Sequence, residues 1–349
     1  MIMIMIGRLI LYMKTRKLRD LIVSEIGIGC MGFSHGYGQI PDENYSIEAI
    51  RKAYDFGCNF FDTAEAYGPN LLPENFGHNE KIVGKAIKDF RKNIILATKL
   101  HLPTEEAKSD GNVYKTLRRH LEASMKRLQT DYVDLYYLHR INPEIPVEEV
   151  AEGMGQLIKD GLIHGWGLSQ VPVKIIDRAQ KITPLSAIQN IYSMIERGVE
   201  EEVIPYCLKN NIGLVAFSPI ASGFLSGKVT VNTEFEKVDD VRKFVPQLTK
   251  ENIAANQPIL DVISRFAKAK NATNAQISLA WMLHKYPNVV PIPGSKNQGR
   301  ILENLGACNV ELTDEEFKEL ETSLNACEIH GHRGFDESEG KSFLQVKHK

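Results

Sequence analysis

The feature that most constrains the fold is an alternation of short β-type runs with amphipathic helical stretches, repeated eight times from residue 26 onward. The expected strands are Ile26–Cys30, Asn59–Asp62, Ile94–Thr98, Val133–Leu138, Ile163–Leu168, Ala187–Asn190, Ile212–Ser218 and Val289–Pro293. The expected helices are Tyr45–Phe56, Glu80–Lys88, Val113–Leu128, Val147–Lys159, Val173–Lys181, Glu201–Asn210, Asn252–Lys270 and Gln298–Ala307. Eight strand–helix repeats in one chain favour an α/β fold of the closed (β/α)8 or TIM-barrel type over an open sheet.

The remaining segments fit one barrel domain over residues 14–325. Residues 14–24 are expected to form a small hairpin that covers the barrel floor, and Thr313–Asn325 is expected to form an extra helix. Gly57, Gly161 and Gly213 fit helix-to-strand turns that need a left-handed residue. The charged stretch Lys228–Thr249 lacks apolar periodicity and is expected to form a mobile flap at the barrel mouth. Residues 1–13 are expected to be a disordered extension, and residues 326–349 a tail that is disordered or lies near the mouth.

Composition narrows the functional classes. A formal net charge of −2 argues against a nucleic-acid-binding surface. Five scattered cysteines without a CxxC pair suit a reducing compartment, so a cytoplasmic location is expected. The apolar N-terminus is too short to span a bilayer and lacks the pattern of a signal peptide, so no membrane association is expected.

Polar side chains follow three successive expected strands. Asp62 ends the second strand, with Tyr67 five residues later; Lys99 follows the third strand and His139 the fourth. In a parallel barrel the carboxyl ends of the strands converge on one mouth. The sequence therefore predicts that these four side chains become neighbours.

Together the four residues suit the reduction of a carbonyl group. A neighbouring ammonium is expected to stabilise the phenolate of Tyr67 and to lower the pKa of this tyrosine, with Asp62 holding Lys99 in place. Tyr67 would protonate the carbonyl oxygen, and His139 would either orient that oxygen or relay the proton. Each residue alone has a structural explanation as a turn cap, a loop aromatic, a solvated lysine or a rim histidine. Their joint occurrence at strand ends favours the catalytic interpretation.

The chain offers an anion site near its C-terminus. Gly27-Ile-Gly-Cys-Met-Gly32 has the letter spacing of a GxGxxG dinucleotide fingerprint, but no suitable acidic partner follows it, so we do not expect a Rossmann site there. The stretch 291–304 leads from the eighth strand through a glycine-containing loop into a helix whose first amides can bind phosphate. Lys296 and Arg300 add positive charge at that point, so a phosphate site is expected after the eighth strand.

Short motifs along residues 14–310 make the chain resemble the aldo-keto reductases, and its mouth loops resemble the bacterial and plant branch. The motifs are Phe61-Asp62-Thr-Ala-Glu-Ala-Tyr67-Gly68, Thr98-Lys99, Leu138-His139, Gly167-Leu-Ser169, Gln189-Asn190, Ala216-Phe-Ser-Pro219, Ile292-Pro-Gly-Ser-Lys296 and Glu303-Asn304. The resemblance implies an NADPH-dependent (NADPH/NADP+) reductase of aldehydes or ketones, with Tyr67 as the acid assisted by Asp62, Lys99 and His139.

The resemblance also implies where the cofactor is held. Ser169 and Gln189 would bind the carboxamide, Phe217 would stack on the nicotinamide, and Gly29, Cys30 and Met31 would border its ribose. Asp62 is also expected to contact the cofactor. The pyrophosphate would lie along Ser218, Pro219, Ile220, Ser222, Gly223 and Leu225. The 2′-phosphate would be held by Ser295, Lys296 and Arg300, and the adenine by Glu303 and Asn304. Gly294 is also expected to contact the cofactor.

Some positions depart from the family pattern or leave alternatives open. Gln170 stands where the family often has Asn, so the amide is retained with a longer reach to the carboxamide. His35, Tyr37, Asn70 and His78 are equally consistent with substrate contact and with ordinary loop roles.

Two other functions fit parts of the sequence. The first is a nucleotide-sensing binding subunit resembling the β-subunits of potassium channels, against which the intact His139 argues. The second is a metal-dependent barrel hydrolase, disfavoured because no His-x-His pair is present and Lys99 would repel a cation. No metal is expected, the expected partner is a small carbonyl substrate, and a homo-oligomer remains open.

Overall fold

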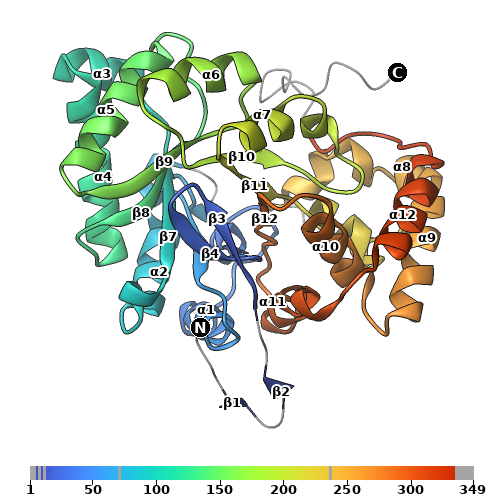
Figure 1. The fold of residues 1–349 in the computed structure, drawn as a ribbon. Coiled ribbons are helices and arrows are strands. Elements are labelled where there is room, and N and C mark those ends of the chain that lie inside the picture. Colours follow the sequence, from blue (N-terminus) through green and yellow to red (C-terminus); the bar gives the residue numbers. More distant parts are fainter. Residues whose placement is uncertain (1–4, 7–8, 11–12, 70–71, 236–237, 335–349) are drawn as a thin grey trace.

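The chain folds into a parallel eight-stranded barrel surrounded by helices (Figure 1). The computed structural model describes residues 5–6, 9–10, 13–69, 72–235 and 238–334. The barrel strands are β5 (Ile28–Gly29), β6 (Phe60–Asp62), β7 (Ile95–Leu100), β8 (Val133–Leu138), β9 (Ile163–Ser169), β10 (Ala187–Ile191), β11 (Gly213–Phe217) and β12 (Val289–Pro291). Each strand pairs with its sequence neighbour, and an isolated parallel bridge from Gly29 of β5 to Gly294, just beyond the end of β12, closes the barrel. The predicted fold class is confirmed.

Helices cover the outside of the barrel. They are α1 (Glu43–Asp55), α2 (His78–Ile87), α3 (Thr104–Asp110), α4 (Val113–Leu128), α5 (Val147–Lys159), α6 (Val173–Ile182), α7 (Val203–Lys209), α8 (Lys250–Ala255), α9 (Gln257–Ala269), α10 (Asn274–Lys285), α11 (Gln298–Leu305) and α12 (Asp314–Asn325). Their apolar faces pack against the strands in one continuous core. The extra helix after the barrel is confirmed as α12.

An antiparallel hairpin closes the amino end of the barrel, as the sequence predicts. β3 (Thr15–Leu18) pairs with β4 (Leu21–Ser24), and Figure 1 shows both in front of the barrel strands. Leu18, Leu21 and Val23 pack into the barrel interior with Phe60 and its neighbours. The hairpin is therefore the floor of the barrel, and the opposite end is left for the site.

One of the three predicted glycine turns is wrong. Gly57 (φ 107°) and Gly161 (φ 73°) adopt left-handed conformations as expected, but before β11 the left-handed residue is Asn211 (φ 55°). Gly213 serves packing instead, since a Cβ there would lie 2.2 Å from Leu18 Cδ2 of the floor hairpin. A side chain at this position would collide with the floor.

The helix predictions were incomplete after β7 and after β11. The short helix α3 was missed, and the expected helix over 252–270 is interrupted at Asn256. Pro258 lies in the first turn of α9, where its missing N–H and its ring prevent continuation from α8. The helix α10 was missed because residues such as Ile277 and Trp281 are buried around most of its circumference, leaving little polar face to reveal its period.

The charged segment after β11, Lys228–Thr249, lies at the barrel mouth. Its C-terminal half, residues 238–249, is attached to neighbouring loops by hydrogen bonds and an ion pair. Val241 N donates to Gly36 O at 3.0 Å, and Gln247 Nε2 donates to Ile195 O at 3.1 Å. His35 Nδ1 lies 2.7 Å from Asp239 Oδ1. Residues 238–249 are thus anchored to the loops after β5 and β10, which does not fit the expectation of a mobile flap for this part of the segment.

The ends of the chain are described in part. In the expected N-terminal extension, β1 (Met5–Ile6) pairs with β2 (Leu9–Ile10). The tail runs back to the barrel, where Asn256 Nδ2 donates to His330 O at 2.8 Å. The rest of the extension and residues 335–349 lie outside the described residues, so the expectations for them stay predictions.

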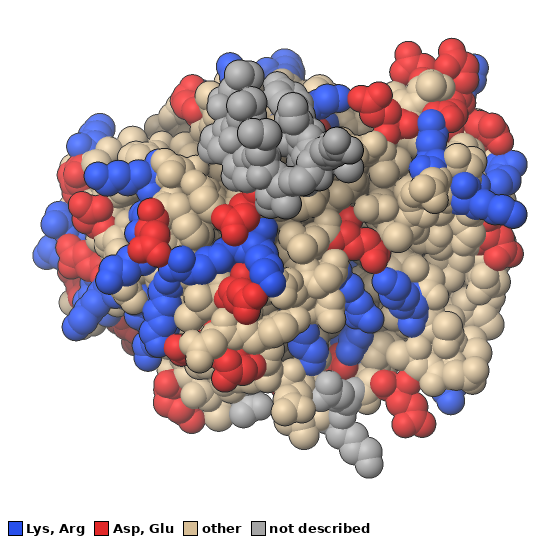
Figure 2. Space-filling view, turned by 90° about the horizontal axis from the view of Figure 1, so that it is seen from below, with Lys and Arg blue, Asp and Glu red and all other residues tan. Residues whose placement is uncertain are grey.

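Surface charge is mixed on the face shown in Figure 2, where Lys and Arg alternate with Asp and Glu. Within the described ranges, no helix has both the length and the apolar character needed to cross a membrane.

Candidate active site

The four proton-handling residues meet at the carboxyl end of the barrel. Asp62 is the last residue of β6, Lys99 lies near the end of β7, and His139 directly follows β8. All three are buried, with exposures of 2%, 0% and 8%, while Tyr67 on the loop after β6 is partly exposed. The residues are brought together because parallel strand ends share one rim.

Lys99 is the centre of this group. Its Nζ forms an ion pair with Asp62 Oδ1, donates to Thr63 O at 2.8 Å and to Tyr67 Oη at 3.4 Å. Gln189 Nε2 donates to the second oxygen, Asp62 Oδ2, at 2.8 Å. An ammonium has three donors, so each N–H of Lys99 has one partner and its direction is fixed.

His139 lies on the other side of Tyr67. The two ring centroids are 5.7 Å apart at an interplanar angle of 79°, and the His101 ring lies 4.4 Å from the His139 ring. Nδ1 of His139 is buried and has no hydrogen-bond partner among the described residues. The imidazole is therefore held by packing and faces the same space as the Tyr67 ring.

The protonation states follow from burial and from the charge of Lys99. Burial raises the pKa of Tyr67, and the opposing effect of Lys99 is smaller, so the expected net lowering was wrong. Burial alone would lower the pKa of Lys99, but Asp62 and Tyr67 together raise it. Burial, with the nearby Lys99, His101 and Arg140, holds the pKa of His139 well below its usual range. At neutral pH the site holds a protonated phenol, an ammonium and a neutral imidazole.

Next to this group, β9 and β10 present polar side chains at their ends. Ser169 Oγ accepts from Arg140 Nη1 at 3.2 Å. The backbone N of Gln170 donates to Asn190 Oδ1 at 2.9 Å, and Asn190 Nδ2 is buried without a partner in the described part of the chain. Gln189, predicted to bind a carboxamide, is turned to Asp62. Asn190 and Arg140 were missed, although both adjoin predicted site residues in the sequence.

The chain leaves β11 through a series of left-handed residues. Phe217 is partly exposed at the end of the strand, and Ser218 (φ 52°), Ala221 (φ 45°), Ser222 (φ 54°) and Gly223 (φ 99°) follow. Non-glycine residues at positive φ are sparse and concentrate at ligand sites. Ser222 Oγ is buried without a partner among the described residues, an orphan donor that a bound phosphate would satisfy.

The other predicted residues of this segment differ in what they can offer. Pro219 is buried, Ile220 packs partly against the core, and the Leu225 side chain is fully buried, so Leu225 can contact a ligand through its backbone alone. Arg333 from the tail donates from Nε to Ser218 Oγ at 3.2 Å. This contact was not predicted, because it joins residues 115 positions apart.

The predicted ribose border has a structural role as well. A Cβ at Gly29 would lie 3.0 Å from Ile292 O, and one at Gly294 would lie 3.1 Å from Gly29 O, so both glycines allow the barrel to close. The Cys30 side chain is fully buried and its backbone N donates to Asp62 O at 2.8 Å. Met31, which begins the next short helix, is partly exposed.

The predicted anion site lies at the start of α11. Lys296 Nζ donates to Tyr37 O and Gln39 O, each at 2.7 Å, whereas Arg300 is exposed. The Asn297 side chain caps the helix by accepting from Arg300 N at 3.0 Å. Lysine and arginine therefore flank this N-terminus, as expected from the sequence.

The other residues predicted to bind the cofactor near α11 make contacts within the protein or are buried. Ser295 Oγ accepts from Asn297 N at 3.1 Å, Glu303 Oε2 lies 3.3 Å from Lys228 Nζ, and Asn304 is buried. The Lys228–Glu303 ion pair joins the segment after β11 to α11. Glu303 and Asn304 lie on α11 with Arg300, and Ser295 lies in the loop before that helix.

Four loop residues were equally consistent with substrate contact and with ordinary loop roles, and the three of them that are described make loop contacts. His35 is buried against Asp239, the Tyr37 carbonyl accepts from Lys296, and His78 Nδ1 lies 2.9 Å from Ser34 Oγ. Asn70 lies outside the described residues. For the three described residues, the loop interpretation is the better supported one.

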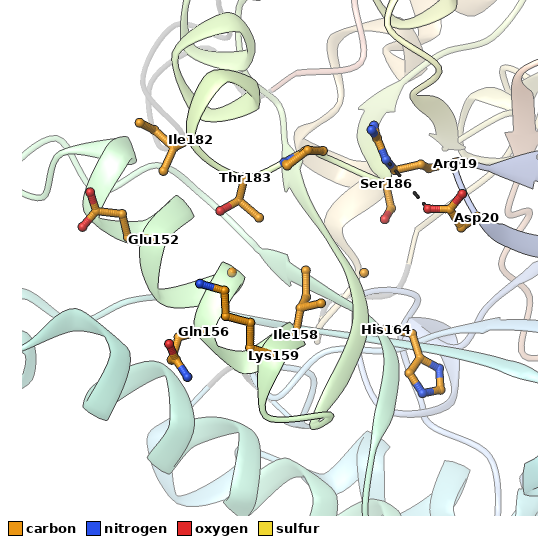
Figure 3. Close-up of a pocket in the computed structure, with 13 residues that line it drawn as sticks. Arg19, Asp20, Glu152, Gln156, Ile158, Lys159, His164, Ile182, Thr183 and Ser186 are labelled. Carbon is orange, nitrogen blue, oxygen red and sulfur yellow. Dashed lines mark ion pairs between the residues drawn. The ribbon is translucent and has the colours of Figure 1, made fainter.

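A cavity of about 610 Å³ lies at the opposite end of the barrel. Figure 3 shows its lining, with Arg19 and Asp20 from the floor hairpin, Lys159 from α5 and His164 from β9. It contains both charge signs and none of the four proton-handling residues. No group of three potential metal ligands was found in the ranges the structure describes.

Comparisons with known proteins agree with this geometry. The model of the aldo/keto reductase family matches residues 25–325. A probable aldo-keto reductase of Glycine max is 35% identical over 90% of this chain and 89% of its own length. The aldo-keto reductase yakc [NADP(+)] of Schizosaccharomyces pombe is 35% identical over 91% of this chain and 94% of its own length.

Solved structures give the same result. A glycerol dehydrogenase of Gluconobacter oxydans superimposes with a TM-score of 0.77 at 28% identity, covering 89% of this chain and 94% of that one. An aldo/keto reductase of Klebsiella pneumoniae in complex with NADP and acetate has a TM-score of 0.69 at 25% identity, covering 93% of this chain and all of that one (100%). The chain belongs to the aldo/keto reductase family.

Proposed function

We propose that this protein is an NADPH-dependent oxidoreductase that reduces the carbonyl group of an aldehyde or ketone to an alcohol. The observation that carries the proposal is the position of Lys99 Nζ, 3.4 Å from Tyr67 Oη and paired with Asp62 in a buried site. Family membership and the NADP named for two relatives support the same reaction class.

The residues perform the proton half of the reaction. Tyr67 holds its proton at neutral pH and donates it from Oη to the carbonyl oxygen. The ammonium of Lys99 stabilises the phenolate that remains, and Asp62 keeps the ammonium in place and charged. His139 is neutral, so its imidazole donates one N–H to the carbonyl oxygen without competing for the proton.

The residues at the mouth fit a nicotinamide dinucleotide. Ser222 Oγ and Asn190 Nδ2 are buried donors without partners in the described chain, Asn190 on β10 and Ser222 on the segment that follows β11. We assign the pyrophosphate to Ser218–Gly223 and the carboxamide to Ser169 and Asn190, with Phe217 beside the ring. Bound NADPH supplies the hydride.

Lys296 and Arg300 favour the phosphorylated cofactor. Arg300 is exposed at the start of α11 and Lys296 lies four residues earlier, so both can reach a 2′-phosphate. A guanidinium matches a phosphate dianion by paired hydrogen bonds, whereas the ribose hydroxyls of NADH offer no such charge.

The test is turnover by the purified protein. Loss of NADPH absorbance is measured with a panel of aldehydes and ketones, and NADPH binding is followed separately by fluorescence. Turnover that disappears in Tyr67→Phe while binding is retained supports the proposal. Tight NADPH binding with no turnover on any carbonyl compound would refute it and favour a nucleotide-sensing subunit.

A further inference from the structure

A partly buried charge bridge lies behind the loop that carries Tyr67, and the proton chemistry above does not use it. His120, on the inner side of α4, lies between two carboxylates. Its Nδ1 is 3.0 Å from Glu65 Oε2 on the loop after β6, and its Nε2 is 3.1 Å from Glu106 Oε2 on α3. One side chain thus joins the loop of Tyr67 to the segment that follows Lys99.

Glu65 is placed so that its position fixes the Tyr67 loop. It lies two residues before Tyr67, and its side chain is 6% exposed. Its backbone N donates to Lys99 O at 3.1 Å, and its carbonyl accepts from Gly77 N at 2.6 Å. Any displacement of Glu65 is therefore transmitted to both Tyr67 and the strand end that holds Lys99.

Both contacts of His120 require the imidazolium. A neutral imidazole has one N–H donor, and here each ring nitrogen faces a carboxylate oxygen. The other charged groups around the bridge come from the elements packed against it: Asp110 on α3, Arg119 and Arg127 on α4, Glu80 on α2, and His101 after β7. On the far side, α5 meets α4 through Gly153, which lies against Tyr114 and Leu117.

We propose that His120 is a positioning residue for Tyr67, and that its imidazolium holds the Tyr67 loop against α3 by bridging Glu65 and Glu106. The inference rests on the proposed carbonyl reduction for its catalytic consequence, but the bridge itself is a structural statement. Small displacements of a reacting group lower rate steeply, so a residue without contact to substrate can control kcat.

The bridge has a defined pH range. The hydrogen bond to Glu65 raises the pKa of His120, burial opposes this, and the charges of both carboxylates add to it. Arg119 lowers the pKa of Glu106, which keeps that partner ionised. The folded pKa lies above the unfolded value of about 6.5, so the bridge is complete at lower pH and is lost as pH rises through the folded value.

Deprotonation leaves one ring nitrogen with a lone pair facing a carboxylate. The Glu65 side chain is 6% exposed and that of Glu106 is 43% exposed, so the Glu106 contact is the one that opens to water. The expected result is an alkaline fall in kcat that belongs to His120, whose pKa is raised from 6.5, and that is separate from the titration of Tyr67, whose pKa is raised from 10.

Two variants and a matched control test the proposal. His120→Gln retains one donor and cannot titrate, and Glu106→Gln removes the outer, more exposed charge without changing the buried partner. The control is His164→Gln, whose Nδ1 lies 3.1 Å from Asp134 Oδ1 at the floor cavity of Figure 3, at the far end of the barrel. Profiles of kcat and KM against pH are measured, with amide hydrogen exchange of the peptide covering residues 63–69.

His120→Gln is expected to lower kcat by about 10-fold to 100-fold, to change the KM for NADPH little, and to abolish the lower alkaline limb. Glu106→Gln is expected to move that limb to lower pH, and His164→Gln to resemble the wild type. Exchange of residues 63–69 is expected to be faster in His120→Gln. An unchanged limb in His120→Gln, or equal loss at every pH, would overturn the inference.

The two proposals fail separately. If the wild type turns over no carbonyl compound, the proposed function fails, and the exchange experiment then decides the bridge. Faster exchange in His120→Gln but not in His164→Gln supports the positioning role, and equal exchange in all proteins overturns it.

Discussion

Replacing Lys99 by methionine separates the structural role of the buried ion pair from its role in catalysis. Lys99 is fully buried and Asp62 is 2% exposed, so the substitution leaves a carboxylate inside the barrel with Gln189 Nε2 as its remaining side-chain donor. Breaking a buried pair by removing one partner costs about 3–5 kcal/mol. The expected loss in unfolding free energy at neutral pH is therefore about 3–5 kcal/mol.

The loss should depend on pH in a defined direction. Burial is the main cause that raises the pKa of Asp62, and Lys99 is the main opposing one. Without Lys99 the folded pKa of Asp62 rises further above its unfolded value of about 3.9. Lys99→Met is therefore expected to come closest to the wild type in stability near and below the unfolded pKa of Asp62. Its stability relative to the wild type is expected to fall as the pH rises through the folded pKa of Asp62.

Urea unfolding followed by circular dichroism, at mildly acidic and mildly alkaline pH, measures both effects. Asp62→Asn in the Lys99→Met background removes the stranded charge and should recover most of the loss. Lys52→Met is the matched control, because it breaks the exposed pair with Glu48 and should cost less than about 1 kcal/mol. Equal stability of Lys99→Met and the wild type, or no recovery in the double variant, would refute the reasoning.

Three further predictions concern the acid, the cofactor and the floor. Tyr67→Phe should lower kcat by about 10²-fold to 10⁴-fold with NADPH binding retained, since it removes the general acid alone; full activity would reassign the acid. Arg300→Ala should raise the KM for NADPH by about 10-fold or more and leave that for NADH nearly unchanged, which steady-state kinetics with both cofactors will show. Gly213→Ala should destabilise the fold by about 1–3 kcal/mol, because its Cβ would lie 2.2 Å from Leu18 Cδ2; an unchanged thermal midpoint would contradict the packing argument.

Local pattern was sufficient where an element has one buried face. The helices Val113–Leu128 and Val147–Lys159 have the predicted bounds, because their apolar residues repeat with the helical period. The strand Val133–Leu138 also has the predicted bounds, although all six of its residues are buried and its apolar run shows no alternation. The helix α10 was missed for the converse reason, as its residues are buried nearly all round. The interruption at Asn256 could have been predicted from Pro258, since a proline inside a helical pattern ends or kinks the helix.

The candidate site could be predicted in its membership but not in its energetics. Asp62, Lys99 and His139 follow successive strands, so topology alone brings them to one rim. The net pKa shift of Tyr67 could not be predicted, because it depends on whether burial or the Lys99 charge has the larger effect. Asn190 was overlooked because only the folded structure shows that its amide is buried. There its Oδ1 accepts from Gln170 N, and its Nδ2 has no partner among the described residues.

The sequence by itself determined the eight-fold alternation, the floor hairpin and the set of residues at the mouth, since periodicity and strand order are local properties. The tertiary structure alone decided the contacts between distant segments: Leu18 under Gly213, Arg333 on Ser218, and His120 between Glu65 and Glu106. The physical reason is that burial and charge pairing depend on distances in space, which residues far apart along the chain acquire when the barrel closes.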